Sequence, residues 1–301
     1  MALLTVFTPT YNRAQTLPRL YASLVHQSDH AFEWVIVDDG STDSTRELVR
    51  AWIQDGHIDI RYHYQSNRGK SSAHNVGVQM ARGDLFTCVD SDDYLTTNAV
   101  ELIHAGWARR AHHVGLLAFK QRTDGQPVTR FERAVATATL FDLYHSYRLR
   151  GDAMLIFSTA VLSQFAFPAF PGERFVPEAY LYDLVDTRGP LLVLPSYLYC
   201  CEYLTDGYTR NMARTLAANP RGCLAYLRNR LAVDRTIRQR LGDTIRYSAI
   251  ALSSRDARPV RGAPFPLLAA LTLPLGYLLY ARRYRPYSQS AAQTSDDGAD
   301  E

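Results

Sequence analysis

The alternation of apolar and polar segments in the first hundred residues constrains this chain more than any other feature. Four apolar runs, each long enough for one buried strand, alternate with segments whose leucines, valines and isoleucines recur at helical spacing. The four runs span residues 3–7, 32–37, 58–64 and 85–89. This alternation predicts an α/β fold with a mostly parallel central sheet flanked by helices.

A polar loop follows each of the four runs. The loops span residues 9–13, 38–43, 67–70 and 90–93. Because the carboxyl ends of parallel strands lie at one edge of a sheet, and ligands of open α/β sheets bind there, the loops are expected to meet. The sequence therefore predicts one site assembled from all four loops.

Three carboxylates follow the fourth run, in Asp90-Ser91-Asp92-Asp93. A strand end orients such carboxylates in one direction, as the binding of a hard divalent ion and its diphosphate requires. Like charges this close repel unless a cation lies among them. A solvated turn that caps the next helix is equally consistent with these four residues taken alone.

The second loop, 38–43, offers a carboxylate to a nucleotide. Asp39 can accept a hydrogen bond from a base N–H or a ribose hydroxyl. The alternative is a helix start with Ser41 or Thr42 as the N-cap residue. Both hold if Asp39 faces the ligand and Ser41 binds the backbone.

Five short motifs in register are similar to those of family 2 glycosyltransferases. They are Thr8-Pro9-Thr10-Tyr11-Asn12-Arg13, Val37-Asp38-Asp39-Gly40-Ser41-Thr42-Asp43, Asn67-Arg68-Gly69, His74-Asn75-Val76-Gly77 and Val89-Asp90-Ser91-Asp92-Asp93. The resemblance covers about residues 3–105. It implies the GT-A fold, a nucleotide diphosphate sugar as donor, a Mn²⁺ or Mg²⁺ ion and an inverting reaction.

The resemblance also implies roles for single residues. Asp92 is expected to bind the metal ion, and Asp93 to share it. His74 stands where many relatives carry arginine, so we expect a histidine on the helix surface without a role in the site. The residues expected to bind the donor are Pro9, Tyr11 and Asp39 around the base, Lys70 near the nucleotide, and Asp90 by the ribose or sugar.

Two later segments, 170–178 and 201–209, resemble a bacterial branch of the family associated with surface polysaccharide assembly. In that family an acidic residue deprotonates the acceptor hydroxyl, since the attacking alcohol must lose its proton as the diphosphate leaves on the opposite face. Glu178 occupies the motif position, and Glu173 is the second choice. A surface glutamate paired with an arginine such as Arg174 is the alternative for either.

The C-terminal third predicts amphipathic helices over 221–253 with a basic face. The apolar stretch 265–280 contains two prolines and a glycine and is too short to span a membrane, but three arginines follow it. Apolar residues beside cations predict peripheral association with an anionic leaflet. The expected domains are a glycosyltransferase domain over 1–215 (nucleotide-binding half 1–110, acceptor half 111–215), a helical membrane-associating region over 216–285 and a disordered tail over 286–301.

The composition of the chain limits its possible partners and its cellular location. The 33 Lys and Arg residues against 30 Asp and Glu leave a net charge of +3, so no nucleic-acid partner is required. Four cysteines without a CxxC pair, and an apolar N-terminus without the features of a secretory signal, predict a cytoplasmic protein on the inner face of the cell membrane.

The expected partners are a nucleotide diphosphate sugar, UDP-linked by resemblance, and a glycan or lipid-linked acceptor. A catalytically inactive nucleotide-sugar-binding scaffold in a membrane complex is the alternative. A nucleotidyltransferase or a dinucleotide-dependent dehydrogenase would require glycines after the first strand, which residues 8–13 lack.

Overall fold

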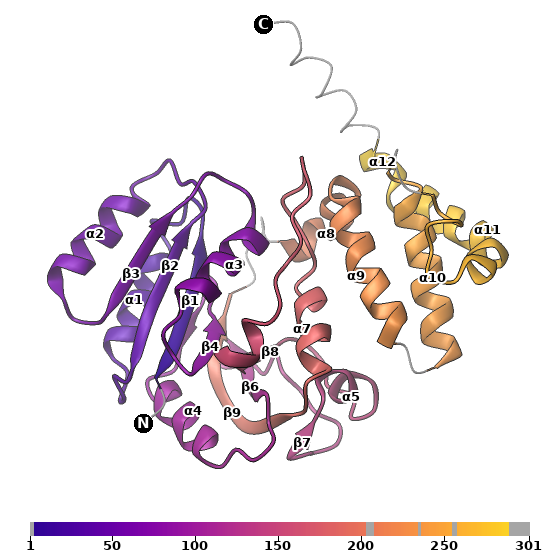
Figure 1. The fold of residues 1–301 in the computed structure, drawn as a ribbon. Helices are drawn as coiled ribbons and strands as arrows, with labels where there is room; N and C mark the ends of the chain where they lie inside the picture. Colours follow the sequence, from indigo (N-terminus) through magenta and orange to yellow (C-terminus); the bar gives the residue numbers. More distant parts are fainter. Residues whose placement is uncertain (1–2, 203–207, 234–235, 255–257, 289–301) are drawn as a thin grey trace, which may run out of the picture. The chain divides into compact units, whose positions relative to one another are not determined.

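The computed structural model describes residues 3–202, 208–233, 236–254 and 258–288 (Figure 1). The chain divides into two compact units. The sheet unit comprises Met1–Ala166 and Leu184–Tyr203, and the helical unit comprises Phe167–Asp183 and Leu204–Glu301.

One nine-stranded sheet, in the order β3-β2-β1-β4-β8-β6-β9-β5 with β7 beside β9, organises the described part of the sheet unit. The strands are β1 (Leu4–Thr10), β2 (Phe32–Asp38), β3 (Ile60–Tyr64), β4 (Leu85–Cys88), β5 (Tyr94–Leu95), β6 (Gly115–Arg122), β7 (Thr137–Ala138), β8 (Ala153–Ser158) and β9 (Leu191–Cys201). The four apolar runs of the N-terminal third therefore form β1 to β4, and the predicted α/β fold is confirmed.

Strand direction divides the sheet into two parts. Strands β1 to β4 pair in parallel, as predicted, and β6 pairs in parallel with β9. Between these parts lies β8, which is antiparallel to both β4 and β6. An antiparallel neighbour needs no crossover helix, which explains why the regular alternation of strands and helices fades after residue 114.

Helices cover both faces of the parallel part of the sheet. The helices of the sheet unit are α1 (Leu17–Val25), α2 (Thr45–Asp55), α3 (Lys70–Met80), α4 (Ala99–Ala108), α5 (Leu140–His145), α6 (Thr159–Leu162) and the end of α7 (Ala179–Asp186). Residues of α1, α2 and α4 share one core cluster with Val6 of β1. On the other face α3 lies against Phe7, since a Cβ at Gly77 would fall 2.3 Å from the Phe7 ring.

The close packing of α3 overturns one prediction. His74 is not on the helix surface: its ring is buried, with centroid distances of 5.5 Å to Phe7 and 5.3 Å to Phe86. The reason is helical spacing, because residue 74 lies on the same face as Gly77 and Val78, which pack on the sheet.

The helical unit contains α8 (Tyr208–Ala218), α9 (Pro220–Val233), α10 (Ile237–Ala251), α11 (Pro266–Arg283), α12 (Arg285–Ser288) and the start of α7. Helices α9 and α10 occupy the stretch 221–253 that was expected to be helical, and Leu224, Leu227 and Leu231 of α9 share a core cluster with Tyr247 and Ile250 of α10. None of the described helices is long and apolar enough to cross a membrane.

The division into units differs from the expected boundary at residue 215. Residues 167–183 belong to the helical unit, and their polar groups bond to Asn219, between α8 and α9, and to α9 itself. The Asn219 Oδ1 accepts hydrogen bonds from the Arg174 and Phe175 N–H groups at 2.8 and 3.1 Å, and Arg230 pairs with Asp183 at 3.2 Å. Of the predicted disordered tail, residues 286–288 are in α12 and 289–301 lie outside the described residues.

Candidate active site

The loops after β1 and β2 are locked together at the carboxyl edge of the sheet. The Asn12 side chain accepts a hydrogen bond from Thr42 N–H at 2.8 Å, and Asn12 N–H donates to Ser41 Oγ at 2.9 Å. Asn12 has a φ of 52°, a left-handed conformation that asparagine tolerates. These contacts hold Tyr11, which is 48% exposed, in the turn that directly follows β1, two residues after Pro9.

The predicted N-cap of the following helix was wrong. Helix α2 begins after Ser44, not after Ser41 or Thr42, whose polar groups bond to Asn12. Asp43 instead accepts hydrogen bonds from the Thr45 N–H and hydroxyl at 3.1 and 2.6 Å. The loop after β2 is therefore longer than the capping pattern suggests, and its hydroxyls hold the neighbouring loop.

Asp39 organises the third loop. Its carboxylate is buried and accepts three hydrogen bonds, from Gln65 Nε2 at 2.7 Å, Arg68 N–H at 2.8 Å and Gly69 N–H at 2.7 Å. The adjacent Gly40 has a φ of 90°, and a Cβ there would lie 2.9 Å from the Asn67 nitrogen. Asp39 thus holds the chain that leads directly into Lys70, the first residue of α3.

Lys70 and Asp90 form an ion pair, with Nζ 2.6 Å from Oδ1. Burial alone would raise the pKa of the Asp90 carboxyl. The cations Lys70 and Lys120, with a smaller contribution from Arg13, outweigh it and hold that pKa below its usual value. The predicted Lys70 and Asp90 positions therefore come together, and the repulsion among the carboxylates of this loop is offset by cations from three different elements.

Asp92 and Asp93 differ in their surroundings. Asp93 is buried, and its two oxygens accept hydrogen bonds from Tyr199 Oη at 2.7 Å and Glu202 N–H at 3.1 Å. Burial, with the Asp90 charge, raises the pKa of Asp93 to about 7. Asp92 is partly exposed, and burial followed by the Asp90 charge raises its pKa as well.

The carboxylates at this edge of the sheet fit a divalent cation only when a bound ligand completes the coordination of the ion. No group of three or more His, Cys, Asp or Glu side chains in the described ranges is arranged to hold a metal ion by itself. Mg²⁺ is commonly bound through one or two carboxylates together with substrate phosphates and waters. Asp92 can supply such a carboxylate, whereas Asp93 already accepts two protein hydrogen bonds.

Sequence reasoning missed Lys120 and Tyr199. The Lys120 Nζ lies 4.0 Å from the centroid of the Tyr199 ring, and the Tyr199 hydroxyl accepts a hydrogen bond from Asp90 N–H at 3.0 Å. One signal was available: the chain has 31 arginines and only two lysines, Lys70 and Lys120. Both lysines act on the same carboxylate, that of Asp90.

The two candidate bases lie in the helical unit, apart in sequence from the donor loops. Glu173 accepts hydrogen bonds from Arg221 N–H at 2.9 Å and Gly222 N–H at 2.8 Å, so it caps the first turn of α9 and does not pair with Arg174. Burial, opposed by these bonds, raises the pKa of Glu173. Glu178 is exposed and accepts a hydrogen bond of 3.4 Å from Tyr182 Oη.

Comparison with known proteins decides the family. The model of the family described as "Glycosyl transferase family 2" matches residues 5–167, which include all four loops of the sheet edge. This chain belongs to glycosyl transferase family 2. Within the family, glycosyltransferase GlyG of Streptococcus pneumoniae is 33% identical over 103 residues, which make up 34% of each chain.

A second relative in the family matches more of the chain. It is the poly(ribitol-phosphate) beta-N-acetylglucosaminyltransferase TarS of Staphylococcus aureus, which is 29% identical over 203 residues, 66% of this chain and 33% of TarS. The chain thus matches about a third of the length of GlyG and of TarS.

Solved structures support the family's GT-A fold. Residues 1–349 of S. aureus TarS match with a TM-score of 0.61 at 19% identity, covering 97% of this chain and 92% of that one. The same part of TarS is known in complex with UDP and with UDP-GlcNAc. Mannosyltransferase PcManGT of Pyrobaculum calidifontis, in complex with GDP-Man and Mn²⁺, matches with a TM-score of 0.54 at 16% identity, covering 98% and 80% of the two chains.

Proposed function

We propose that this protein is an inverting glycosyltransferase that moves a sugar from a nucleotide diphosphate sugar to a glycan or lipid-linked acceptor in polysaccharide synthesis. The observation that carries the proposal is the Lys70–Asp90 pair at the edge of the sheet, where cations from α3, β6 and the loop after β1 act on a carboxylate two residues before Asp92. The TarS complexes with UDP and UDP-GlcNAc favour a UDP-sugar as the donor.

The donor would lie across the carboxyl ends of β1, β2 and β4. Tyr11, half exposed beside Pro9, offers a ring to the base, and Asp39 keeps the loop before Lys70 in place. Lys70 and Lys120 would supply positive charge for the diphosphate, and Asp90, paired with Lys70, would accept a ribose or sugar hydroxyl.

Asp92 would hold the divalent ion, Mn²⁺ or Mg²⁺, together with the donor phosphates. A bound ion stabilises the charge that develops on the leaving diphosphate. Asp93 would stabilise the loop through its hydrogen bonds with Tyr199 and Glu202. It would share the ion only if these hydrogen bonds break. PcManGT, which shares this fold, is known in complex with GDP-Man and Mn²⁺, and this complex supports a divalent ion beside the donor.

Glu178 would serve as the base that takes the proton of the acceptor hydroxyl. Of the two glutamates, Glu178 is exposed, while the Glu173 carboxylate already accepts two backbone N–H groups of α9. A base must be able to approach the proton that it removes, which favours Glu178.

The acceptor and the location complete the proposal. A peripheral position on the cytoplasmic face of the cell membrane would bring the site to a lipid-linked acceptor. The alternative, an inactive scaffold that binds the donor without turnover, predicts donor affinity but no sugar release.

Calorimetric titration with UDP and GDP, with and without Mn²⁺, tests the donor site. We expect UDP binding that strengthens with Mn²⁺, and loss of the Mn²⁺-dependent part in Asp92→Ala. A matched Asp124→Ala variant, which removes a carboxylate from the exposed turn after β6, should bind as the unaltered chain does. Absence of nucleotide binding under every condition would overturn the proposal, and binding without release of sugar from any UDP-sugar would favour the scaffold.

A further inference from the structure

Helix α11 leaves a row of leucines in solvent. The side chains of Leu267, Leu271, Leu275 and Leu278 are 84, 80, 52 and 46% exposed. Their spacing of four, four and three residues places all of them on one face of the helix. Single exposed leucines are ordinary on protein surfaces, but a continuous apolar row marks an interaction site.

The opposite face of α11 explains why the leucines stay outside. Ala269, Thr272 and Gly276 are buried there, and a Cβ at Gly276 would lie 2.8 Å from the Cβ of Ser248 in α10. Only small residues allow this approach, so α11 cannot rotate its leucines inward without losing the contact with α10. The packing of α11 on α10 therefore keeps the leucine row exposed.

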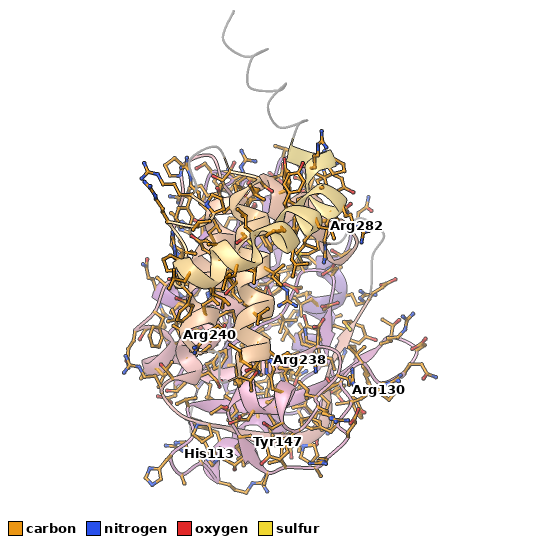
Figure 2. All side chains as sticks on the ribbon, turned by 90° about the vertical axis from the view of Figure 1, so that its right-hand side faces the viewer. His113, Arg130, Tyr147, Arg238, Arg240 and Arg282 are labelled. Atoms are coloured by element: carbon orange, nitrogen blue, oxygen red, sulfur yellow. The ribbon has the colours of Figure 1, made fainter. Side chains whose placement is uncertain are left out.

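Cations continue the row. Arg282 follows Leu278 by four residues, which places it on the same side of the helix, and Figure 2 shows it at the C-terminal end of α11. Arg283 and Arg285 follow, and all three are exposed. Residues 262–288 contain these three arginines and no Asp, Glu or Lys.

We propose that the α11 row, defined as Leu267, Leu271, Leu275, Leu278 and Arg282, docks this protein flat on an anionic phospholipid surface. The leucines would enter the acyl boundary, and the arginines would meet lipid phosphates. A second copy of the chain would offer its own arginines and no carboxylate on this helix, so lipid is the better complement. The inference rests on the membrane location in the proposed function and names the surface that produces it.

Vesicle sedimentation of the full chain tests the inference. The probes are vesicles of phosphatidylcholine alone and of phosphatidylcholine mixed with phosphatidylglycerol. We expect pelleting mainly with the mixed vesicles. The double variant Leu267→Ser/Leu271→Ser should bind them at least about tenfold more weakly. Arg282→Gln/Arg283→Gln should bind them about twenty-five-fold more weakly, at about fivefold per charge.

Matched variants on α2 serve as controls. Ile53→Ser removes an exposed apolar side chain, and Arg50→Gln removes an exposed cation. Both should pellet as the unaltered chain does. Equal binding by the leucine variant would overturn the inference, as would a failure of the unaltered chain to bind mixed vesicles.

Sedimentation velocity without lipid tests whether a second copy of the chain, and not lipid, covers the α11 row. A concentration-dependent dimer that the leucine variant abolishes would assign the α11 row to a second copy and overturn the inference. UDP titration of the same variants distinguishes this failure from failure of the donor site. The leucine and arginine variants of α11 should bind UDP as the unaltered chain does.

Discussion

The second and fourth loops of the sheet edge have similar sequences, but their carboxylates have different partners. Asp39 accepts hydrogen bonds from the Arg68 and Gly69 N–H groups and the Gln65 amide. Asp90 instead faces the ammonium groups of Lys70 and Lys120. A carboxylate that follows a strand can therefore hold a loop in place or pair with cations. Only the groups that contact it distinguish the two roles.

The two candidate bases repeat this contrast in the helical unit. Glu173 accepts hydrogen bonds from two backbone N–H groups at the start of α9, while Glu178 is exposed and accepts a hydrogen bond of 3.4 Å from Tyr182 Oη. A carboxylate held by backbone groups is expected to contribute to stability, and an exposed one can change partners during a reaction. The following predictions test this difference.

The largest effect is expected for Glu178→Gln, which removes the proposed base. Transfer from a UDP-sugar should fall by about a thousandfold, within the range of general base catalysis. UDP affinity and the melting temperature should not change. Turnover in a radiolabelled sugar assay checks the rate, and retained activity would contradict the role of Glu178.

Asp39→Ala should mainly affect folding. The change leaves the Arg68 and Gly69 N–H groups and the Gln65 amide without their buried acceptor, at a cost of about 3 kcal/mol. Chemical denaturation of the variant measures this loss. An Asp39 variant of unchanged stability that has lost UDP binding would show that its carboxylate acts on the ligand alone.

Lys120→Gln should weaken UDP binding by about tenfold, equivalent to about 1.4 kcal/mol, with no change for uridine, which lacks the diphosphate. The reason is that Lys120 supplies one of the cations around Asp90. Lys120→Arg should retain most of the affinity. Equal losses for UDP and uridine in calorimetry would mean that Lys120 acts on the shape of the site and not on phosphate.

The smallest effect is expected for Glu173→Gln. The variant keeps the shape of the side chain but loses its charge and one acceptor at the first turn of α9, which should cost about 1 kcal/mol. Thermal unfolding measures the change, with Glu178→Gln as the matched control. Loss of transfer without loss of stability would instead make Glu173 the base.

Local patterns predicted the elements that carry the site. The apolar runs of β1, β2, β3 and β4 and the loops after them could be read from residues close in the chain, and Lys70 and Asp90 were both expected near the donor. The errors were local as well. His74 was assigned to the helix surface because many relatives carry arginine at its position, but it lies on the same face of α3 as Gly77 and Val78 and packs on the sheet.

Contacts between residues far apart in the chain could not be predicted from the same local patterns. Tyr199 bonds to Asp93, 106 residues earlier, and Lys120 comes from β6, across the antiparallel β8 from the loops of β4. Neither position shows a spacing that marks it. Only the scarcity of lysine in an arginine-rich chain could have singled out Lys120.

The sequence by itself determined the α/β alternation, the four polar loops at one sheet edge and the family, because strand and helix periodicity and short motifs depend on neighbouring residues. Tertiary structure decided which carboxylates face cations and which bind backbone N–H groups. It also decided that the leucines of α11 face outward. Both outcomes depend on what packs against a residue from elsewhere in the chain, such as Tyr199 against Asp93 and Ser248 against Gly276.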